Sequence, residues 1–282
     1  MRSVSVELPE AYILSEQMSK ELVDKEVVGC ELQNILNFQN LGFINIYSSD
    51  FNRLRGGKIA SVVSRGNVIR VKLDNANNLL LAPEYGGVIL YHPNRNSAPS
   101  KFHLKVSFKD DSALTVTLTG MGIIKALTDE ELKDSYVYKR DFSATASPTD
   151  ADFTFERFTK DLAGRNVNIK TVLVGKDAIV VGLGNSAFQD IIYRAKIHPK
   201  RKALDLNEKE KRALYGAVKL VVEQRIKLGG KNQFIDFYGK QGTYTPAMGP
   251  NMKSRACMAC GTMVEKLSLG GGQVYCCPSC QK

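Results

Sequence analysis

Apolar positions at the start of the chain repeat with a helical period. Within residues 7–27, Ala11, Leu14, Met18 and Leu22 are three or four positions apart, so a helix places them on one stripe. The polar residues between them fall on the other side. This stretch is predicted to form an amphipathic helix that buries its apolar stripe.

From about residue 28 to residue 125 the pattern changes to short β-branched runs. Clusters of glycine, asparagine, aspartate or proline separate the runs at intervals of about ten residues. This rhythm is typical of a two-layer antiparallel β-sandwich or barrel. The predicted strands are residues 59–66, 67–73, 78–82, 87–92, 104–108 and 113–120.

Helical patterns dominate the second half of the chain. The clearest helix is predicted at 208–228, where Asn207 is a suitable N-cap and Glu210 completes a capping box. A second helix is predicted to begin near Asn185, and the proline turn IHPKR lies between the two helices. The stretch DFSATASPTDAD at 141–152 is predicted to be a linker.

The composition excludes several classes of protein. The 282 residues are 43% hydrophobic and 24% charged, the balance of a globular protein with one large or two ordinary domains. No apolar run reaches the roughly 18 residues of a membrane span, and MRSVSVELPE does not resemble a signal peptide. We therefore expect a cytoplasmic protein, associated with the nucleoid if it is bacterial, that has no membrane partner.

The net charge of +10 is concentrated near the C-terminus. Residues 194–282 hold 17 lysines and arginines against six acidic residues, whereas residues 1–193 hold 22 against 23. A local excess of this kind favours a polyanion partner, and nucleic acid more than a membrane because no amphipathic anchor is evident. The alternative is a solvated basic face that binds nothing.

Five of the six cysteines lie in the last 26 residues, which indicates a metal site in a reducing compartment rather than a disulfide framework. Cys257 and Cys260 form one CxxC pair, and Cys277 and Cys280 form another after 16 intervening residues. Two such pairs predict a tetrahedral zinc site, and four protein ligands make the zinc structural. Cys276 competes with Cys277 as a ligand, but only Cys277 forms a CxxC pair with Cys280.

Four motifs occur together in a fixed order. They are ELPEA near the N-terminus, VVGLGN at 180–185, IHPKR at 197–201 and a terminal CxxCGT…GG…CCPxCQ. Through them the sequence resembles the formamidopyrimidine-DNA glycosylase / endonuclease VIII family of base-excision repair enzymes over essentially the whole chain. The resemblance is strongest at 164–230 and 255–281.

This resemblance implies an α+β multidomain protein that binds damaged DNA. Residues 1–140 are expected to form an N-terminal helix plus an antiparallel β-sandwich. Residues 141–250 are expected to form a helical domain with a helix–two-turn–helix, and residues 251–282 a zinc-finger β-hairpin with four cysteine ligands. We expect the protein to be a monomer that binds the DNA phosphate backbone.

Several residues match the family's phosphate contacts. Gly184 and Asn185 lie in a Gly-x-Gly-Asn turn at a predicted helix N-terminus, where amide groups and the helix dipole attract a phosphate. Lys170 matches a lysine of the family, and His103, close to Lys105, matches a phosphate-contacting histidine. The alternatives are an ordinary tight turn and a surface histidine on a strand.

The catalytic positions depart from the family. There, the amine of an N-terminal proline attacks C1′ of a flipped damaged nucleotide and forms a Schiff base, and the adjacent glutamate acts as acid/base. Glu7 matches that glutamate, but Val6 replaces the proline and five residues precede it. A peptide nitrogen is no nucleophile because its lone pair is delocalised, so Val6 could act only if processing exposed its amine.

Other functional positions are also substituted. The family's β-elimination lysine matches Asn67, and the segment that fills the DNA void matches residues 120–122 and Tyr85. The zinc-finger arginine matches Gly272. Two functions therefore stay open, a DNA glycosylase with AP-lyase activity and a catalytically silent protein that binds damaged or structured DNA. An RNA-binding zinc-ribbon protein is a third interpretation.

Overall fold

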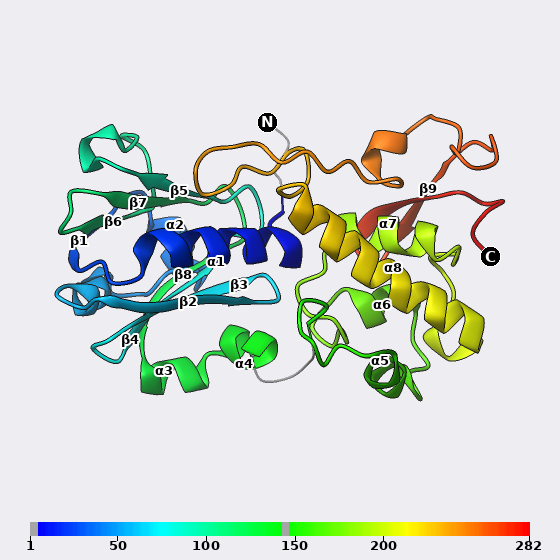
Figure 1. Ribbon diagram of the computed structural model, residues 1–282, viewed down its shortest axis with the longest axis horizontal. Coiled ribbons are helices and arrows are strands. Elements are labelled where there is room, and N and C mark those ends of the chain that lie inside the picture. The colour runs from blue at the N-terminus through cyan, green and yellow to red at the C-terminus, as the bar shows by residue number, and fades with distance from the viewer. Residues whose placement is uncertain (1–4, 143–146) are drawn as a thin grey trace. The chain divides into compact units, whose positions relative to one another are not determined.

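The computed structural model describes residues 5–142 and 147–282. The chain divides into two compact units (Figure 1). Unit 1 comprises residues 1–143 and 228–243, and unit 2 comprises residues 144–227 and 244–282. The division of the chain into three domains at residues 140 and 250 stays a prediction.

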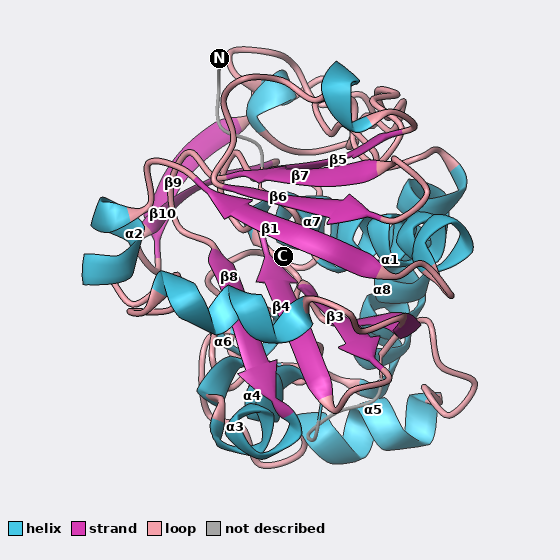
Figure 2. Cartoon of the chain, turned by 90° about the vertical axis from the view of Figure 1, so that its left-hand side faces the viewer, coloured by secondary structure: helices cyan, strands magenta, loops and turns pink. Residues whose placement is uncertain are grey.

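Two four-stranded antiparallel sheets form the centre of unit 1 (Figure 2). Their strands are β1 (Val27–Leu32), β2 (Ile59–Arg65), β3 (Val68–Leu73), β4 (Asn77–Ala82), β5 (Val88–His92), β6 (Leu104–Phe108), β7 (Ala113–Thr117) and β8 (Ile123–Thr128). One sheet has the order β1-β6-β7-β5 and the other the order β2-β3-β4-β8. The prediction of antiparallel sheets is confirmed.

The strands form because their β-branched and apolar side chains fill a shared core. Leu80, Leu104 and Phe108 are completely buried. Strands β1 and β8 were not among the predicted runs. Most of β1 is only half-buried, and β8 alternates buried Ile124 and Ala126 with less buried residues, so neither forms a continuous apolar run.

The first helix, α1 (Leu8–Leu22), buries the predicted apolar stripe against β2 and β3. The structure ends α1 five residues before the predicted boundary. Asp24 adopts a left-handed backbone with φ 69°, which turns the chain into β1. The shorter elements of unit 1 are α2 (Leu36–Asn40), η1 (Ser48–Leu54), η2 (Arg95–Ser97), α3 (Asp129–Asp134) and α4 (Tyr136–Phe142).

Residues 228–243 follow the longest helix of unit 2 but belong to unit 1. Gln17 on α1 donates to Asp236 Oδ2 over 2.8 Å and accepts from the Phe237 amide over 3.0 Å. The Phe237 carbonyl accepts from the Tyr91 amide on β5. These bonds hold the segment on unit 1.

Unit 2 contains the predicted pair of helices and the C-terminal hairpin. Asn207 and Glu210 form the expected capping box, with reciprocal bonds of 2.9 and 3.0 Å. The helices of unit 2 are α5 (Phe155–Leu162), α6 (Ile169–Leu173), α7 (Asn185–Arg194), η3 (Ala203–Asp205), α8 (Glu208–Lys227) and η4 (Pro250–Met252). The hairpin strands are β9 (Glu265–Leu269) and β10 (Gly272–Cys276).

The predicted linker at 141–152 is only partly irregular. Residues 141–142 complete α4, residues 143–146 lie outside the described residues, and 147–152 form turns in which Asp150 accepts from the Ser147 amide. In the described part of the chain, no helix has the length and apolar character needed to span a membrane.

Candidate nucleic-acid interface and metal centre

The two CxxC pairs of unit 2 meet at one point. The sulfurs of Cys257, Cys260, Cys277 and Cys280 all lie within 4.8 Å of one another. Two of the separations, Cys257–Cys280 and Cys260–Cys277, are 3.9 and 3.5 Å. Tetrahedral zinc with Zn–S bonds near 2.3 Å requires sulfurs about 3.8 Å apart, so the four thiols fit such an ion.

Cys276, the competing ligand, lies outside this group of sulfurs. It is completely buried and pairs with Glu265 across the hairpin. Burial raises the pKa of its thiol to about 11. By contrast, hydrogen bonds with the side chain and backbone of Thr262 lower the pKa of the Cys260 thiol to about 6, which favours the thiolate that a metal needs.

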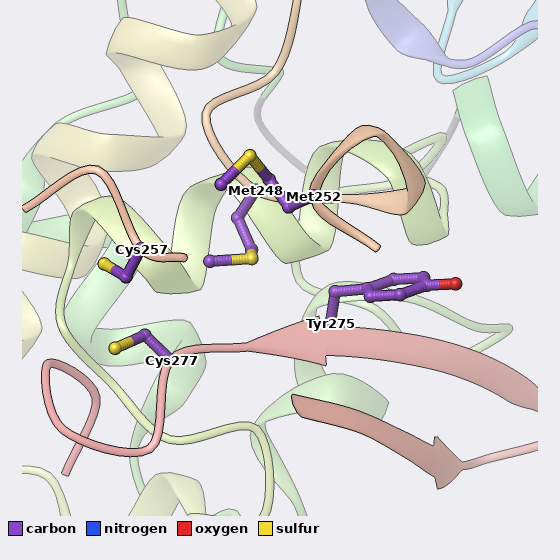
Figure 3. Close-up of a cluster of buried hydrophobic side chains, with 5 residues drawn as sticks. All are labelled: Met248, Met252, Cys257, Tyr275 and Cys277. Carbon is purple, nitrogen blue, oxygen red and sulfur yellow. The ribbon is translucent and has the colours of Figure 1, made fainter. Parts of the chain in front are cut away.

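The cysteine cluster is packed against other apolar side chains of unit 2. Met248, Met252 and Tyr275 form a buried cluster with Cys257 and Cys277 (Figure 3). This packing fixes the cysteine-bearing turns next to the apolar cluster. Three polar contacts add to it. The Tyr193 hydroxyl contacts the Cys257 sulfur, Gln189 Oε1 accepts from the Tyr275 backbone amide, and Gln281 Nε2 donates to the Ile197 backbone carbonyl.

Two predicted phosphate contacts meet at the tip of the hairpin. Lys170 Nζ on α6 donates to the Leu269 carbonyl over 2.6 Å, and Asn185 Nδ2 at the start of α7 donates to the Gln273 carbonyl over 2.7 Å. Lys170 is 7% exposed, and burial lowers its pKa. A basic side chain and a polar amide therefore lie side by side at the hairpin.

Gly272 lies between these two side chains. A Cβ atom at this position would lie 3.3 Å from Lys170 Nζ and 3.8 Å from the Asn185 amide atoms. A larger residue here would therefore crowd the lysine. Gly184, the N-cap of α7, carries no side chain that could cover the helix N-terminus.

His103 and Lys105 lie in unit 1, at the start of β6. His103 Nδ1 accepts from the Leu118 amide over 2.9 Å, and its ring packs edge-on against Phe38. Burial lowers the pKa of His103, so the neutral ring presents an Nε2–H donor. Lys105 already pairs with Glu31 over 3.0 Å, which favours a structural role for this lysine.

The nitrogen of Val6 is engaged in the fold of unit 1. It donates to the Glu84 carbonyl over 3.2 Å, and Ser5 pairs with Tyr85 in an isolated antiparallel bridge. Val6 is 3% exposed. An amide nitrogen held in this way cannot act as a nucleophile.

Glu7 is the N-cap of α1, and its buried carboxylate accepts from the Glu10 amide. The Ser5 hydroxyl donates to the same carboxylate over 3.3 Å. The Lys231 ammonium lies 3.8 Å from Glu7 Oε1 and donates to Ser5 Oγ over 3.1 Å. The residue that matches the family's acid/base group therefore contacts a buried lysine.

Asn67, the residue that the resemblance aligns with a lysine, lies in the turn between β2 and β3. Its amide donates to Glu84 Oε1 over 3.3 Å and accepts from Arg140 over 3.4 Å. Arg140 on α4 also pairs with the completely buried Asp141. A guanidinium from another element thus lies beside Asn67.

Tyr85 and Met121 occupy neighbouring positions and are about half exposed. The Tyr85 amide donates to the Met121 carbonyl over 2.9 Å. A Cβ atom at Gly122 would lie 2.7 Å from Leu118 Cδ2 and 3.1 Å from the Ala82 carbonyl, so this loop packs closely only with glycine. The tyrosine places an aromatic ring next to a segment whose own sequence has none.

The predicted site residues fall into two groups. Lys170, Gly184, Asn185 and the four cysteines lie in unit 2, whereas Val6, Glu7, His103 and Lys105 lie in unit 1. Their roles stay predictions. Sequence reasoning missed Ser5, Lys231 and Arg140, because nothing in the local sequence distinguishes them from surface residues.

Comparison with known proteins shows which proteins this chain is similar to. A sequence model described as "Formamidopyrimidine-DNA glycosylase H2TH domain" matches residues 145–235. The formamidopyrimidine-DNA glycosylase of Streptococcus pneumoniae R6 is 25% identical over 98% of both chains. The enzyme of that name from Listeria innocua is 33% identical over 48% of this chain and 50% of its own. The chain is therefore similar to formamidopyrimidine-DNA glycosylases over nearly its whole length, and residues 145–235 match their H2TH domain.

Solved structures of Fpg and MutM proteins share the fold of this chain. The complex between the Lactococcus lactis Fpg and an abasic site containing DNA matches with a TM-score of 0.84 at 21% identity, over 98% of this chain and 99% of that chain. A structure of MutM with carbocyclic 8-oxo-G containing DNA matches with a TM-score of 0.82 at 22% identity, over the same shares. These likenesses support the α+β architecture with its antiparallel sheets and C-terminal cysteine cluster.

Proposed function

We propose that this protein is a DNA-repair protein that binds damaged DNA and acts as a DNA glycosylase with AP-lyase activity in base-excision repair. Similarity to formamidopyrimidine-DNA glycosylases over 98% of the chain, and the match of residues 145–235 to their H2TH domain, support the proposal. The L. lactis and MutM relatives were solved with DNA that contains an abasic site or an 8-oxo-G. Oxidised purines and the abasic sites left by their removal are the substrates we propose.

The observation that carries DNA binding is the pairing of Lys170 and Asn185 at the hairpin. Taking an ammonium out of water costs free energy unless acceptors surround it. Lys170 Nζ has three N–H donors, and one of them donates to the Leu269 carbonyl. A DNA phosphate beside the α7 N-terminus would accept the remaining protons and complement the helix dipole.

Zn²⁺ is the metal we propose for the four cysteines. The sulfur-only ligand set suits a soft or borderline ion, and the separations fit a tetrahedron. Because all four positions are filled by protein, the metal would hold the hairpin and take no part in chemistry. The hairpin in turn positions the carbonyls that accept from Lys170 and Asn185.

Replacing Lys170 with methionine is expected to weaken binding to a damaged duplex about tenfold and to reduce the salt slope by about one. Asn185→Ala is expected to have a smaller effect in the same direction. Both losses should be similar for every sequence, because a phosphate contact does not read bases. Fluorescence anisotropy titrations at several salt concentrations measure affinity and slope together.

Lys160→Met is the matched control, since Lys160 is an exposed lysine on α5 of the same unit. It should leave affinity and salt slope unchanged, and Lys170→Arg should retain most of the affinity. An equal loss from Lys160→Met, or a loss from Lys170→Met confined to one base sequence, would contradict the phosphate role. A competing RNA duplex that displaces the DNA at equal concentration would favour an RNA-binding protein instead.

A catalytically silent DNA-binding protein is the second candidate function. It is favoured by the Val6 nitrogen, which is bonded to the Glu84 carbonyl, and by Asn67, which replaces the family's lysine. In this case the protein would act by recruitment or protection.

Base release separates the two candidates. A duplex with one 8-oxoguanine is incubated with excess protein, and the free base is measured by mass spectrometry. We expect release that Glu7→Gln abolishes, because the carboxylate would no longer accept protons. DNA binding without release, by the wild-type protein on 8-oxoguanine and other oxidised bases, would establish the silent protein.

A further inference from the structure

Lys231 makes unusual contacts for a residue that follows a helix. It is the fourth residue after α8, which ends at Lys227, yet only 6% of its side chain is exposed. Its amide donates to Glu10 Oε1 over 3.2 Å, which fixes its backbone beside the start of α1. The side chain then extends towards Glu7.

Three polar groups form a chain around this lysine. Lys231 Nζ donates to Ser5 Oγ over 3.1 Å, and Ser5 Oγ donates to Glu7 Oε1 over 3.3 Å. The direct distance from Nζ to Glu7 Oε1 is 3.8 Å. A proton can therefore pass from the ammonium through the hydroxyl to the carboxylate.

A primary amine next to a carboxylate is the pair that imine chemistry requires. The amine attacks an aldehyde carbon, and the carboxylate moves the protons. The Val6 nitrogen cannot supply this amine because it is a peptide nitrogen bonded to the Glu84 carbonyl. Lys231 brings an amine to Glu7 from a different part of the chain.

We propose that Lys231 is the amine through which this protein forms a covalent imine with C1′ of an abasic deoxyribose in DNA. The inference rests on the proposed function, because it takes damaged DNA as the substrate. The substrate class is the open-chain aldehyde form of the abasic sugar.

The step balances with the groups present. Lys231 gives one proton through Ser5 to Glu7, and its free electron pair forms the N–C1′ bond while the C1′ oxygen takes up a proton from Glu7. The carbinolamine nitrogen then gives a second proton to that oxygen, which leaves as water. The C=N bond forms as the water departs. Ser5 has to leave the amine for the sugar to approach, at the cost of one hydrogen bond.

Borohydride trapping on the full-length protein tests the assignment. Sodium cyanoborohydride supplies the hydride that reduces the imine to a stable amine, so protein and abasic duplex become linked. Peptide mass mapping then identifies the linked residue. We expect Lys231. Linkage to the N-terminal α-amine or to another lysine, or the absence of linkage, would overturn the proposal.

Lys231→Arg keeps the positive charge beside Glu7 but removes the amine, so linkage should fall by roughly 100-fold or more. Lys240→Arg is the matched control, since Lys240 is an exposed lysine of the same segment. It should link as the wild type does. If Lys231→Arg links to DNA as much as the wild type does, the proposal is overturned. If this variant does not fold, the residue that peptide mapping identifies in the wild-type protein still tests the proposal.

Binding of the same duplex is measured in parallel without reductant. A wild-type protein that does not bind abasic or 8-oxoguanine DNA would contradict the proposed function itself. A protein that binds tightly but does not link would contradict only the role of Lys231. The two failures are therefore distinguishable.

Discussion

Replacing Cys277 with serine is expected to release the bound metal and unfold the C-terminal hairpin. The exposed strand β9 contributes little buried surface of its own, so we expect the hairpin to depend on the proposed metal for its fold. Structural zinc sites contribute roughly 10–16 kcal/mol of apparent binding free energy at neutral pH, and most of this is lost with one ligand. Zinc content should fall from one ion per chain to none.

Loss of the hairpin should also weaken DNA binding. The carbonyls of Leu269 and Gln273 hold Lys170 and Asn185 in place, and both belong to the hairpin. We expect affinity for a damaged duplex to fall by more than the tenfold effect of Lys170→Met. Metal analysis and anisotropy titration of the same sample test both statements.

Cys276→Ser is the matched control, because the same substitution falls on the adjacent buried cysteine that lies outside the group of four sulfurs. It should retain one zinc ion and full DNA affinity, although burial of a hydroxyl lowers its stability somewhat. The reverse result, in which Cys276→Ser loses the metal and Cys277→Ser keeps it, would contradict the assigned ligand set.

Local signals predicted much of the fold. The ends of α8 follow from Asn207, Glu210 and the two glycines at 229–230, each of which acts within a few residues. The CxxC spacing predicted the sulfur group for the same reason, since each pair is a single turn. Such features can be predicted from the sequence because the residues that interact are near each other in it.

Features that depend on partners far apart in the sequence could not be predicted from the sequence. Lys231 and Ser5 are 226 positions apart, and each is an ordinary loop residue until the fold brings them to Glu7. Arg140 reaches Asn67 across 73 positions in the same way. Contacts of this kind are set by the fold and leave no pattern in the local sequence.

Asp190 on α7 forms a buried network that holds the segment leading to the cysteine cluster. Its side chain is 1% exposed and accepts from Arg194 Nε over 3.0 Å and from the Ala247 amide over 3.1 Å. It also accepts from the Tyr244 hydroxyl, which is buried. Burial and the neighbouring carboxylate raise the pKa of Tyr244, so the phenol stays protonated and donates.

Asp190→Ala is expected to destabilise the protein by about 3 kcal/mol, because it leaves the Tyr244 hydroxyl and the Ala247 amide without an acceptor and Arg194 without its charge partner. The thermal midpoint should fall by roughly 10 °C. Glu208→Ala, which removes an exposed ion pair with Lys211 in the same unit, should leave the midpoint nearly unchanged.

The order of events on heating distinguishes this network from a general loss of stability. The segment after Tyr244 leads to Met248, which packs on Cys257 and Cys277. In Asp190→Ala this segment should become sensitive to protease while the zinc ion is still bound, because no ligand has been removed. Zinc release before cleavage, or a midpoint equal to that of Glu208→Ala, would show that the metal alone holds the segment and that Asp190 does not.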